Sequence, residues 1–407
     1  MYFSNISKEE FKEFSDHSSM KTFMQTEEVA MLREKNGWKS HFVGVKKDDI
    51  LVAAAMLLSK RRHFGRYEFY SPRGFLLDYN DFLLLDFFTQ EMKKYVKKNK
   101  GYMFRIDPYI INVERDGNGN ILENGIDHSA IKKHLFQLGY KCIPKEKREQ
   151  VSWMYVLDID GKSEDEVFKN MKQNTRNIIR KTLKHGIEIQ ELSKSELKEF
   201  YKIMEDTGKR KGFAIRNLQY YENMYDAFYD KGEIKYLVAK LDLDKQIKVL
   251  SEEVDCCLKE KEKLDGNKHH EGKIKSLDEQ VQGLLKTIKM AEEIRKRDGN
   301  IITLSGSQFM LVQPEVIYLS SGNYEEYLFY NSQYLIQWEM IKYAVKNGFK
   351  RYNFYGITGN FDPNDKDYGI YKFKTGFNGY CEELIGEYVM PVSFHYYLLD
   401  FLMRFKK

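Results

Sequence analysis

The sequence predicts a mixed α/β fold of two domains, with an antiparallel coiled-coil hairpin inserted into the second. With 407 residues, the chain is long enough to bury two hydrophobic cores. Stretches of strand and helix periodicity alternate both before and after residue 145. Within the second half, residues 242–298 are densely charged, contain no proline and repeat apolar residues at heptad spacing.

The first unit, residues 1–144, alternates predicted helices and strands. Ser7 with Glu10 has the pattern of a capping box, and Thr26 is the expected N-cap of a second short helix. Asp81 begins an amphipathic helix whose lysines come late, where the helix dipole favours them. Strands are predicted at 41–45, 50–58, 67–70 and 102–106, and a further helix at 129–138.

The second unit begins near Val151 and again mixes the two kinds of element. Ser163 with Glu166, and Ser193 with Glu196, have the spacing of capping boxes. Strands are predicted at 151–157, 234–239, 302–312 and 316–319, and helices at 173–185, 193–206, 218–229 and 327–346. An aromatic, amphipathic helix is expected over 393–407.

The predicted hairpin has an apolar seam on each of its two helices. The seam positions step by three and four residues, as on helices that pack along one another. Gly266, Asn267 and Gly272 are expected to break the chain between two arms of about 30 Å, at ~1.5 Å per residue. Lysine and glutamate are mixed along both arms, so a solvated brace, a dimer contact and an arm that touches RNA all stay open. The seam residues are Ile247, Leu250, Val254, Cys257, Lys261, Leu264, Ile274, Leu277, Val281, Leu284, Ile288 and Ala291.

Composition argues against several classes of protein. The net charge of +5 does not by itself indicate a nucleic-acid binder, so a polyanion site must be a local patch. The longest apolar run, 50–58, is too short to span a bilayer, and the N-terminus lacks the pattern of a secretory signal. The four cysteines and nine histidines show no metal-ligand spacing. We therefore expect no metal site, and free thiols in a reducing cytosol.

The densest run of aromatic residues and glycines is 351–387. A strand is expected to end at Gly356 and to be followed by a turn-rich loop. Over 371–377, aromatic residues then alternate with Lys372 and Lys374, which is the period of a strand. Lys374 is therefore either an ordinary solvent-facing cation or a cation held over a reacting group.

The order of these residues resembles a known family. The strings YNFYGI, DYGIYKFKTGFNG and EELIGE follow one another as in the C-terminal signature of the FemABX aminoacyltransferases, which build the cross-bridge of Gram-positive peptidoglycan. The resemblance covers nearly the whole chain, and the hairpin favours the FemA/FemB/MurM-like branch. It implies two acyltransferase (GNAT)-like domains. The first would comprise residues 1–144 plus about 369–407, the second 145–241 plus 299–368, and the hairpin 242–298.

The activity implied by the resemblance is transfer of glycine, alanine or serine from aminoacyl-tRNA to the cross-bridge amine of a lipid-linked peptidoglycan precursor, without a cofactor. Such an enzyme would be cytoplasmic. Its C-terminal helix would either contact the inner membrane surface peripherally or pack into the first domain. A homodimer, or a heterodimer with a related transferase, is a further expectation.

Two other functions stay open beside this one. An acyl-CoA-dependent N-acyltransferase would carry a glycine-rich pyrophosphate loop. The nearest match, 280–283, lies in the predicted hairpin and lacks the second glycine. A non-catalytic tRNA-binding scaffold would use the hairpin alone. A Lys374→Ala variant separates the first function from the scaffold, because only the first needs that side chain for chemistry.

The resemblance also implies residues for the reaction. Phe373 and Lys374 match a pair at the reaction centre, where Lys374 would stabilise the oxyanion of a tetrahedral intermediate. Asp107 follows a buried-type strand and would position or deprotonate the ammonium nucleophile, although an aspartate there is equally typical of a plain strand-to-turn junction. Because the donor ester is already activated, no protein nucleophile is required.

Further residues are implied in substrate binding. Arg176, on the basic helix NTRNIIRKTLKHGIEI, matches an arginine that grips a diphosphate, whereas Arg180 stands where the family has an aromatic residue. By themselves these cations are equally typical of a solvated helix face. The other implied contacts are Arg33 as a phosphate ligand, Trp38 beside it, Arg73 in a groove-shaping turn, and either Tyr220 or Tyr221 against the substrate peptide.

Overall fold

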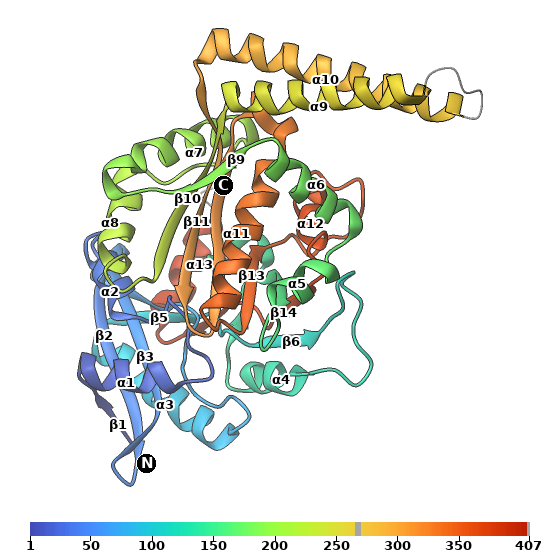
Figure 1. Ribbon diagram of the computed structural model, residues 1–407. Helices are drawn as coiled ribbons and strands as arrows, with labels where there is room; N and C mark the ends of the chain where they lie inside the picture. The colour runs from blue at the N-terminus through green and yellow to red at the C-terminus, as the bar shows by residue number, and fades with distance from the viewer. Residues whose placement is uncertain (265–269, 405–407) are drawn as a thin grey trace.

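The computed structural model describes residues 1–264 and 270–404. It contains two β-sheets with helices packed on them, and a pair of long helices that projects from one end of the molecule (Figure 1). The predicted mixed α/β class is confirmed. None of the helices in the described ranges combines the length and the apolar character that crossing a membrane requires.

The first sheet has seven strands in the order β1-β2-β3-β4-β5-β15-β7. Neighbouring strands are antiparallel except for β4 and β5, which are parallel. Alternate side chains of β3 enter two different buried clusters, Ala55 on one face and Ala54 on the other, which explains its unbroken apolar run. The strands are β1 (Tyr2–Asn5), β2 (Lys39–Lys47), β3 (Ile50–Arg61), β4 (Tyr67–Ser71), β5 (Gly101–Ile106), β7 (Lys141–Cys142) and β15 (Tyr388–Pro391).

Two pairs of helices cover the two faces of this sheet. Helices α3 (Phe82–Lys98) and α4 (Ser129–Gln137) share one cluster with Ala55, and α1 (Lys8–His17) and α2 (Glu27–Glu34) share the other with Ala54. The predicted N-caps Ser7 and Thr26 each accept the expected backbone hydrogen bond, and Asp81, predicted as the first residue of its helix, is instead its N-cap and accepts from the Leu84 N–H. The capping box at Ser7 is only half formed, since the Glu10 carboxylate pairs with Lys46 at 2.5 Å.

The second sheet has eight strands in the order β6-β14-β8-β13-β12-β11-β10-β9. Only β12 and β13 are parallel neighbours. Strands β6 and β14 come from 1–144 and 369–407, the ranges expected for the first domain, so the chain passes between the sheets repeatedly. The domain bounds stay a prediction. The strands are β6 (Ile111–Glu114), β8 (Trp153–Asp158), β9 (Ile187–Glu191), β10 (Ile234–Asp242), β11 (Ile301–Val312), β12 (Glu315–Asn323), β13 (Arg351–Gly356) and β14 (Tyr380–Leu384).

One buried cluster joins the two sheets. It runs from Phe11 and Val29 on the first sheet's helices to Phe200 on α7 (Leu197–Lys211) and Tyr221 on α8 (Leu218–Phe228). The opposite face of the second sheet packs on α5 (Glu164–Asn170), α6 (Gln173–Lys184) and α11 (Ser332–Lys346). A shared core of this kind holds the sheets in one fixed arrangement, with the loops between them close together.

Several element bounds differ from the prediction. Residues 371–377 are not a strand: α12 (Tyr368–Thr375) is a helix whose buried residues, Tyr371, Lys374 and Thr375, lie on one helical face. Ser163 with Glu166 forms the predicted capping box at α5. Ser193 and Glu196 also form theirs, but it closes a 3-10 turn, and α7 then continues to Lys211. The helix predicted at 327–346 is a 3-10 turn, Glu325–Tyr330, followed by α11.

The projecting pair consists of α9 (Leu243–Leu264) and α10 (Glu271–Asp298), which lie side by side (Figure 1). The predicted seam residues Val254, Cys257, Leu277 and Val281 form a buried cluster between them. Ion pairs flank it, such as Lys261–Asp278 at 2.5 Å. The predicted break at Gly266 and Asn267 lies outside the described residues, and Gly272 lies within the first turn of α10 rather than at a break.

The C-terminal helix α13 (Phe394–Arg404) packs on β5 and β15. Its Leu399 is buried among Tyr102, Met103 and Val389. Another face of the same helix carries aromatic side chains into solvent, with Phe394 74% exposed. Helix α13 therefore packs on the first sheet with one face and exposes aromatic side chains on another. Residues 405–407 of the predicted helix lie outside the described ranges.

Candidate active site

The end of β13 departs from a regular strand. Its register with β8 shifts between Asn353 and Gly356, and Tyr355 adopts a left-handed φ of 61°. The side-chain oxygen of Asn353 accepts a hydrogen bond from the Tyr355 backbone N–H at 2.7 Å. The carbonyl oxygens of Tyr355 and Gly356 both accept hydrogen bonds from Lys374.

Lys374 is a buried cation, which excludes the solvent-facing alternative. Its Nζ donates to the carbonyl oxygen of Gly356 at 2.6 Å and to that of Tyr355 at 3.2 Å, and the residue is only 4% exposed. Burial penalises the charged form and lowers the pKa of Lys374 to about 7. The neighbouring Phe373 packs edge-on against Tyr334, with 4.7 Å between ring centroids.

Lys374 lines a cavity of about 520 Å³ between α12 and the second sheet. The wall combines aromatic rings with hydroxyl and amide groups, and with the cations of Lys211 and Lys366. Such a mixture suits a small polar acyl group better than an extended apolar chain. Its other lining residues include Leu319, Ser320, Ser321, Asn323, Gln333, Tyr334, Tyr355 and Phe373.

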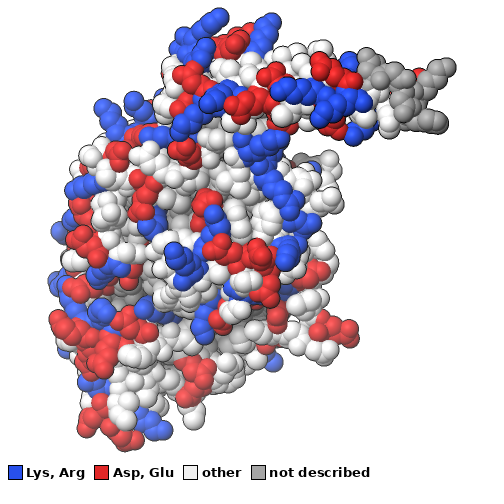
Figure 2. Space-filling view, in the orientation of Figure 1, with Lys and Arg blue, Asp and Glu red and all other residues white. Residues whose placement is uncertain are grey.

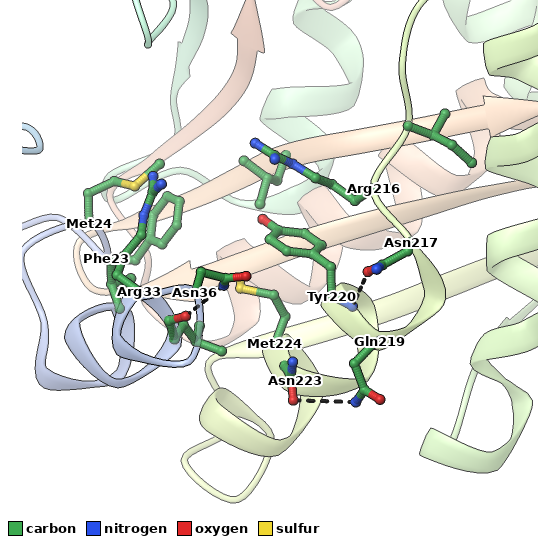
Figure 3. Close-up of a pocket in the computed structure, with 14 residues that line it drawn as sticks. Phe23, Met24, Arg33, Asn36, Arg216, Asn217, Gln219, Tyr220, Asn223 and Met224 are labelled. Carbon is green, nitrogen blue, oxygen red and sulfur yellow. Dashed lines mark hydrogen bonds between the residues drawn. The ribbon is translucent and has the colours of Figure 1, made fainter. Parts of the chain in front are cut away.

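A second cavity, of about 560 Å³, lies between α2 and the start of α8 (Figure 3). Arg33 enters it from α2, and Arg216 and Tyr220 enter it from the other side. Asn217 caps α8 by accepting from the Tyr220 backbone N–H at 3.0 Å, which fixes this corner. Because Leu319 lines both cavities, the second cavity meets the Lys374 cavity at that side chain.

The structure distinguishes the two candidate tyrosines. Tyr221 is buried at 2% exposure, edge-on to Phe200 at 5.2 Å, and belongs to the shared core. Tyr220 lines the second cavity, with the Arg216 guanidinium 5.3 Å from its ring centroid. Trp38 packs against the shared core with Lys60 over its ring, and does not line either cavity in the described part of the chain.

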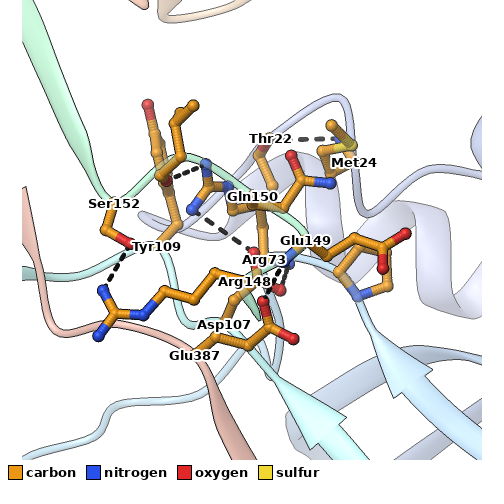
Figure 4. A network of polar contacts seen from close by, with 12 residues as sticks. Thr22, Met24, Arg73, Asp107, Tyr109, Arg148, Glu149, Gln150, Ser152 and Glu387 are labelled. Atoms are coloured by element: carbon orange, nitrogen blue, oxygen red, sulfur yellow. Dashed lines mark hydrogen bonds and ion pairs between the residues drawn. The ribbon is translucent and has the colours of Figure 1, made fainter. Parts of the chain in front are cut away.

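Arg73 and Asp107 form a buried pair beneath this region (Figure 4). Asp107 Oδ1 accepts from the Arg73 backbone N–H at 2.9 Å, and Oδ2 lies 3.5 Å from the guanidinium. Arg73 also donates to the Val151 carbonyl at 2.9 Å and lies over the Tyr109 ring. Burial raises the pKa of Asp107 to about 6, and Arg73 offsets part of that rise. Among the described residues, Oδ2 accepts no hydrogen bond.

A chain of ion pairs connects the second cavity to the end of the first sheet. Arg33 lies 3.9 Å from Glu149, whose other oxygen lies 3.3 Å from Arg105. Arg105 in turn pairs with the buried Glu387 at 2.9 Å. Arg33 therefore lies near a carboxylate, at a separation too long for a hydrogen bond, while its guanidinium lines the cavity, where its N–H donors can bind an anion.

A buried cluster fixes β13 between its neighbours. Arg351 binds Glu315 on β12 at 3.0 Å and Glu382 on β14 at 2.8 Å. Glu315 also accepts from the Tyr109 hydroxyl at 2.8 Å and from the Asn353 side chain at 3.1 Å. Although burial opposes its charge, the two carboxylates raise the pKa of Arg351. This cluster therefore supports the same Asn353 that holds the Tyr355 turn.

The basic helix α6 lies apart from these two cavities. Arg176 donates to the backbone carbonyls of Lys169, at 2.6 Å, and of Met171, so its guanidinium binds its own chain. Arg180 lies over the Phe168 ring and lines a third cavity, of about 410 Å³, between α6 and the hairpin. Figure 2 shows Lys and Arg side chains gathered below the hairpin. The same cavity is lined by Lys181, Lys184, His185, Glu253, Gln280, Gly283, Leu284 and Thr287.

Some site residues were not predicted from the sequence. Arg216 stands only four residues before Tyr220, so a basic residue beside that tyrosine was the available signal. No sequence pattern marks Glu149 or Arg105 as a site residue. Their role depends on being close to Arg33, and only the folded chain brings these residues together. The described residues contain no group of three or more His, Cys, Asp or Glu side chains that could hold a metal ion.

Known proteins resemble this chain over nearly its full length. A family model described as the FemAB family matches residues 6–404. Aminoacyltransferase FemA of Staphylococcus epidermidis is 33% identical over 405 residues, covering 97% of this chain and 96% of the relative. Aminoacyltransferase FemB of the same species, strain ATCC 12228 / FDA PCI 1200, is 33% identical over 414 residues, covering 100% and 99%. A crystal structure of FemX superposes with a TM-score of 0.75 at 25% identity, covering 98% of this chain and 99% of that one.

These matches, together with the fold, define the chain as an aminoacyltransferase. It belongs to the FemAB family. The family resemblance and the enzyme class expected from the sequence are therefore confirmed.

Proposed function

We propose that this protein transfers an amino acid, glycine, alanine or serine, from aminoacyl-tRNA to the cross-bridge amine of a lipid-linked peptidoglycan precursor. One observation carries the proposal in a chain of this family. Lys374 is a buried cation on the wall of one cavity, and that cavity meets a second, arginine-lined cavity at Leu319. An activated acyl group and an anionic acceptor thus have adjoining sites.

The reaction needs little covalent chemistry from the protein. The acceptor amine attacks the carbonyl carbon of the aminoacyl ester, a C–N bond forms, and the C–O bond to the tRNA ribose breaks. The ribose oxygen takes a proton and the amine loses one. An ammonium group has three N–H donors. Lys374 gives two of them to Tyr355 and Gly356, and the third would stabilise the oxyanion of the intermediate.

Asp107 is proposed to receive the acceptor ammonium. One of its carboxylate oxygens accepts no hydrogen bond within the described residues, and its pKa is raised to about 6 by burial. A carboxylate with these properties can position an ammonium group and accept its proton near neutral pH. Arg73 would keep the carboxylate in place, because its backbone N–H binds Oδ1 and its guanidinium lies 3.5 Å from Oδ2, the oxygen that the ammonium would share.

The second cavity is proposed to hold the diphosphate of the acceptor. Replacing Arg33 or Arg216 by alanine is expected to raise KM for the precursor by about 10–100-fold with little change in kcat, because each removes a charge-assisted hydrogen bond. Steady-state kinetics with varied precursor measures this. Lys47→Ala, at the far end of β2, is the matched control and should behave as wild type. An unchanged KM in both arginine variants would contradict this assignment.

The cleft between α6 and the hairpin is proposed to contact the tRNA backbone. Its cations come from α6, at Arg180, Lys181 and Lys184, and the part of α10 that lines it is uncharged. The one carboxylate in the lining, Glu253 on α9, pairs with Lys184 at 2.7 Å and leaves Arg180 and Lys181 for a polyanion. Replacing these three cations by alanine is expected to raise KM for aminoacyl-tRNA at least about tenfold and to flatten its salt dependence. A short 3′-aminoacylated oligonucleotide, too small to reach the cleft, should be used equally well by both proteins.

The control for this prediction removes the same number of cations elsewhere. Lys94, Lys97 and Lys98 on α3 are exposed, and their triple alanine variant should keep the wild-type KM. Equal KM values for the α6 variant and wild type would instead favour the hairpin as a brace. A lower mass in solution for the α6 variant would favour a dimer contact.

A lipid-linked acceptor would bring the reaction to a membrane surface. The outward face of α13 exposes Phe394 and Tyr397, and the Lys141 ammonium lies 4.7 Å from the Tyr397 ring centroid. Aromatic side chains beside a cation are typical of helices that lie at a lipid interface. We therefore propose α13 as the peripheral membrane contact of this enzyme.

The proposed function is tested by mass spectrometry of the precursor. The purified protein is incubated with a full set of charged tRNAs and with lipid-linked precursor, either bare or already carrying a partial bridge. A gain of one or more residue masses supports the function and identifies the donor. No gain with either precursor, together with acetylation when acetyl-CoA is supplied, would favour an acyl-CoA-dependent enzyme instead.

A further inference from the structure

Tyr355 has an unusual backbone conformation for a bulky residue. Its φ of 61° lies in the left-handed region, which residues with a side chain beyond Asn and Asp rarely enter. In a regular strand, successive carbonyl groups point in opposite directions, yet those of Tyr355 and Gly356 both accept from Lys374 Nζ. The left-handed turn is thus what directs two consecutive carbonyl oxygens at one ammonium group.

The surrounding structure holds this conformation in place. The Asn353 side-chain oxygen accepts from the Tyr355 N–H at 2.7 Å, and the Asn353 amide nitrogen donates to Glu315 at 3.1 Å and to the Tyr109 hydroxyl at 3.1 Å. Backbone conformations of this kind persist only where neighbouring contacts enforce them, and they concentrate at functional sites. Here the contacts of Asn353 fix the orientation of the two carbonyl groups that bind Lys374.

The side chain of Tyr355 reaches toward the other half of the site. The residue lines the Lys374 cavity, and its hydroxyl donates to the Gln150 side chain at 3.3 Å. Burial raises the pKa of its phenol, and the charge of Arg73, the partner of Asp107, opposes that rise. One residue therefore touches Lys374 through its main chain and the acceptor side through its ring.

We propose that Tyr355 is a positioning residue for the transfer reaction: its backbone fixes the Lys374 ammonium, and its ring forms the boundary at which the acceptor amine meets the acyl group. This inference rests on the proposed function for its kinetic consequences. The role of the Tyr355 backbone does not rest on it, because the protonation of Lys374 can be measured without any transfer reaction.

Two substitutions separate the backbone and side-chain roles. Tyr355→Val removes the ring and disfavours the left-handed turn, because a β-branched residue rarely adopts a positive φ, so kcat should fall by about 10–100-fold as Lys374 moves out of place. Tyr355→Asn also removes the ring but tolerates the left-handed turn, so kcat should stay near wild type. In the Asn variant, KM for the precursor should rise by about 3–10-fold, the contribution of an aromatic contact.

The titration of Lys374 tests the positioning role directly, because a Tyr355 that only stabilised the fold would not change the pH at which Lys374 loses its proton. Its ammonium is followed by NMR as pH is raised. We expect the titration to shift to lower pH in Tyr355→Val, since an ammonium that loses an acceptor gives up its proton more readily, and to stay unchanged in Tyr355→Asn. Asp49→Val disfavours a similar left-handed residue, φ 64°, in the β2–β3 turn and is the control for the loss of such a turn elsewhere in the chain.

The outcomes distinguish this inference from the proposed function. A wild-type kcat and an unshifted Lys374 titration in Tyr355→Val would overturn the inference, while transfer by the wild-type protein would still stand. If the wild-type protein transfers no amino acid, the proposed function fails, and the Lys374 titration alone decides whether Tyr355 positions that ammonium. If Tyr355→Val does not fold, Tyr355→Asn remains, and an unchanged KM in that variant would overturn the side-chain role.

Discussion

Replacing Lys374 by methionine is expected to lower kcat for amino-acid transfer by about 10²–10³-fold, the usual effect of removing one oxyanion donor. Methionine keeps most of the length and apolar character of the side chain but has no N–H to give. The carbonyl oxygens of Tyr355 and Gly356 would lose their donor while the cavity wall keeps its shape. Single-turnover kinetics with saturating aminoacyl-tRNA measures the chemical step directly.

A neighbouring lysine supplies the control for this prediction. Lys372 lies on the same helix with its side chain in solvent, so Lys372→Met should transfer within about twofold of wild type, as surface changes usually do. Equal rates for Lys374→Met and wild type would show that Lys374 does not act on the oxyanion. Equal losses in both variants would point to helix α12 rather than to the buried ammonium.

The lowered pKa of Lys374 also fixes the sign of its pH dependence. The protonated form is the donor, so its contribution to kcat should disappear as pH rises through about 7, and the falling limb should be absent from Lys374→Met. For stability, the unfolded chain binds the proton more tightly between pH 7 and the ordinary lysine value. The free energy of unfolding of wild type, relative to Lys374→Met, should therefore increase with pH above about 7.

Local periodicity explains what could be predicted of the fold. The unbroken apolar run at 50–58 becomes β3 because alternate residues, such as Ala54 and Ala55, enter cores on opposite faces. The heptad positions Val254 and Leu277 are buried between α9 and α10. In each case the residues that carry the signal are close in sequence and apolar, so the pattern survives without knowledge of the rest of the chain.

Helix α12 shows where that reasoning fails. Its buried residues, Tyr371, Lys374 and Thr375, are spaced by three and one, which is a helical face. One of them is a lysine, which sequence analysis assigns to the solvent-exposed face. With Lys374 assigned to that face, residues 371–377 alternate between aromatic and polar, as in a strand. The misassigned period therefore comes from the very residue whose burial makes it a candidate for catalysis.

Long-range partners account for the rest of the unpredicted site. Arg33 could be proposed as a phosphate ligand, but its contact with Glu149 and the link to Arg105 require segments far apart in the sequence to meet. The reverse holds for Arg176, whose sequence pattern suggests a ligand while its guanidinium is bound to the carbonyls of Lys169 and Met171. A charge pattern on a helix shows which side chains could bind a ligand. It does not show whether each side chain points toward a ligand site or toward its own backbone.

The buried cluster around Arg351 gives the largest expected change in stability. Arg351→Met would leave the carboxylates of Glu315 and Glu382 buried without their shared cation, at a cost of about 3–5 kcal/mol in the free energy of unfolding at pH 7. Urea unfolding measures the loss. Lys350→Met is the matched control, because that side chain is 64% exposed and should change stability by less than about 0.5 kcal/mol.

The loss should also depend on pH in a definite direction. Burial raises the pKa of Glu382 and Arg351 opposes that rise, so without Arg351 the pKa of Glu382 rises further, and the folded variant takes up a proton as pH falls and regains part of its stability between pH 7 and pH 5. Because Glu315 also binds Asn353, the same variant should loosen the Tyr355 turn and lower kcat. A small loss that does not change with pH would mean that water reaches these carboxylates, and that β13 is fixed by its strand hydrogen bonds alone.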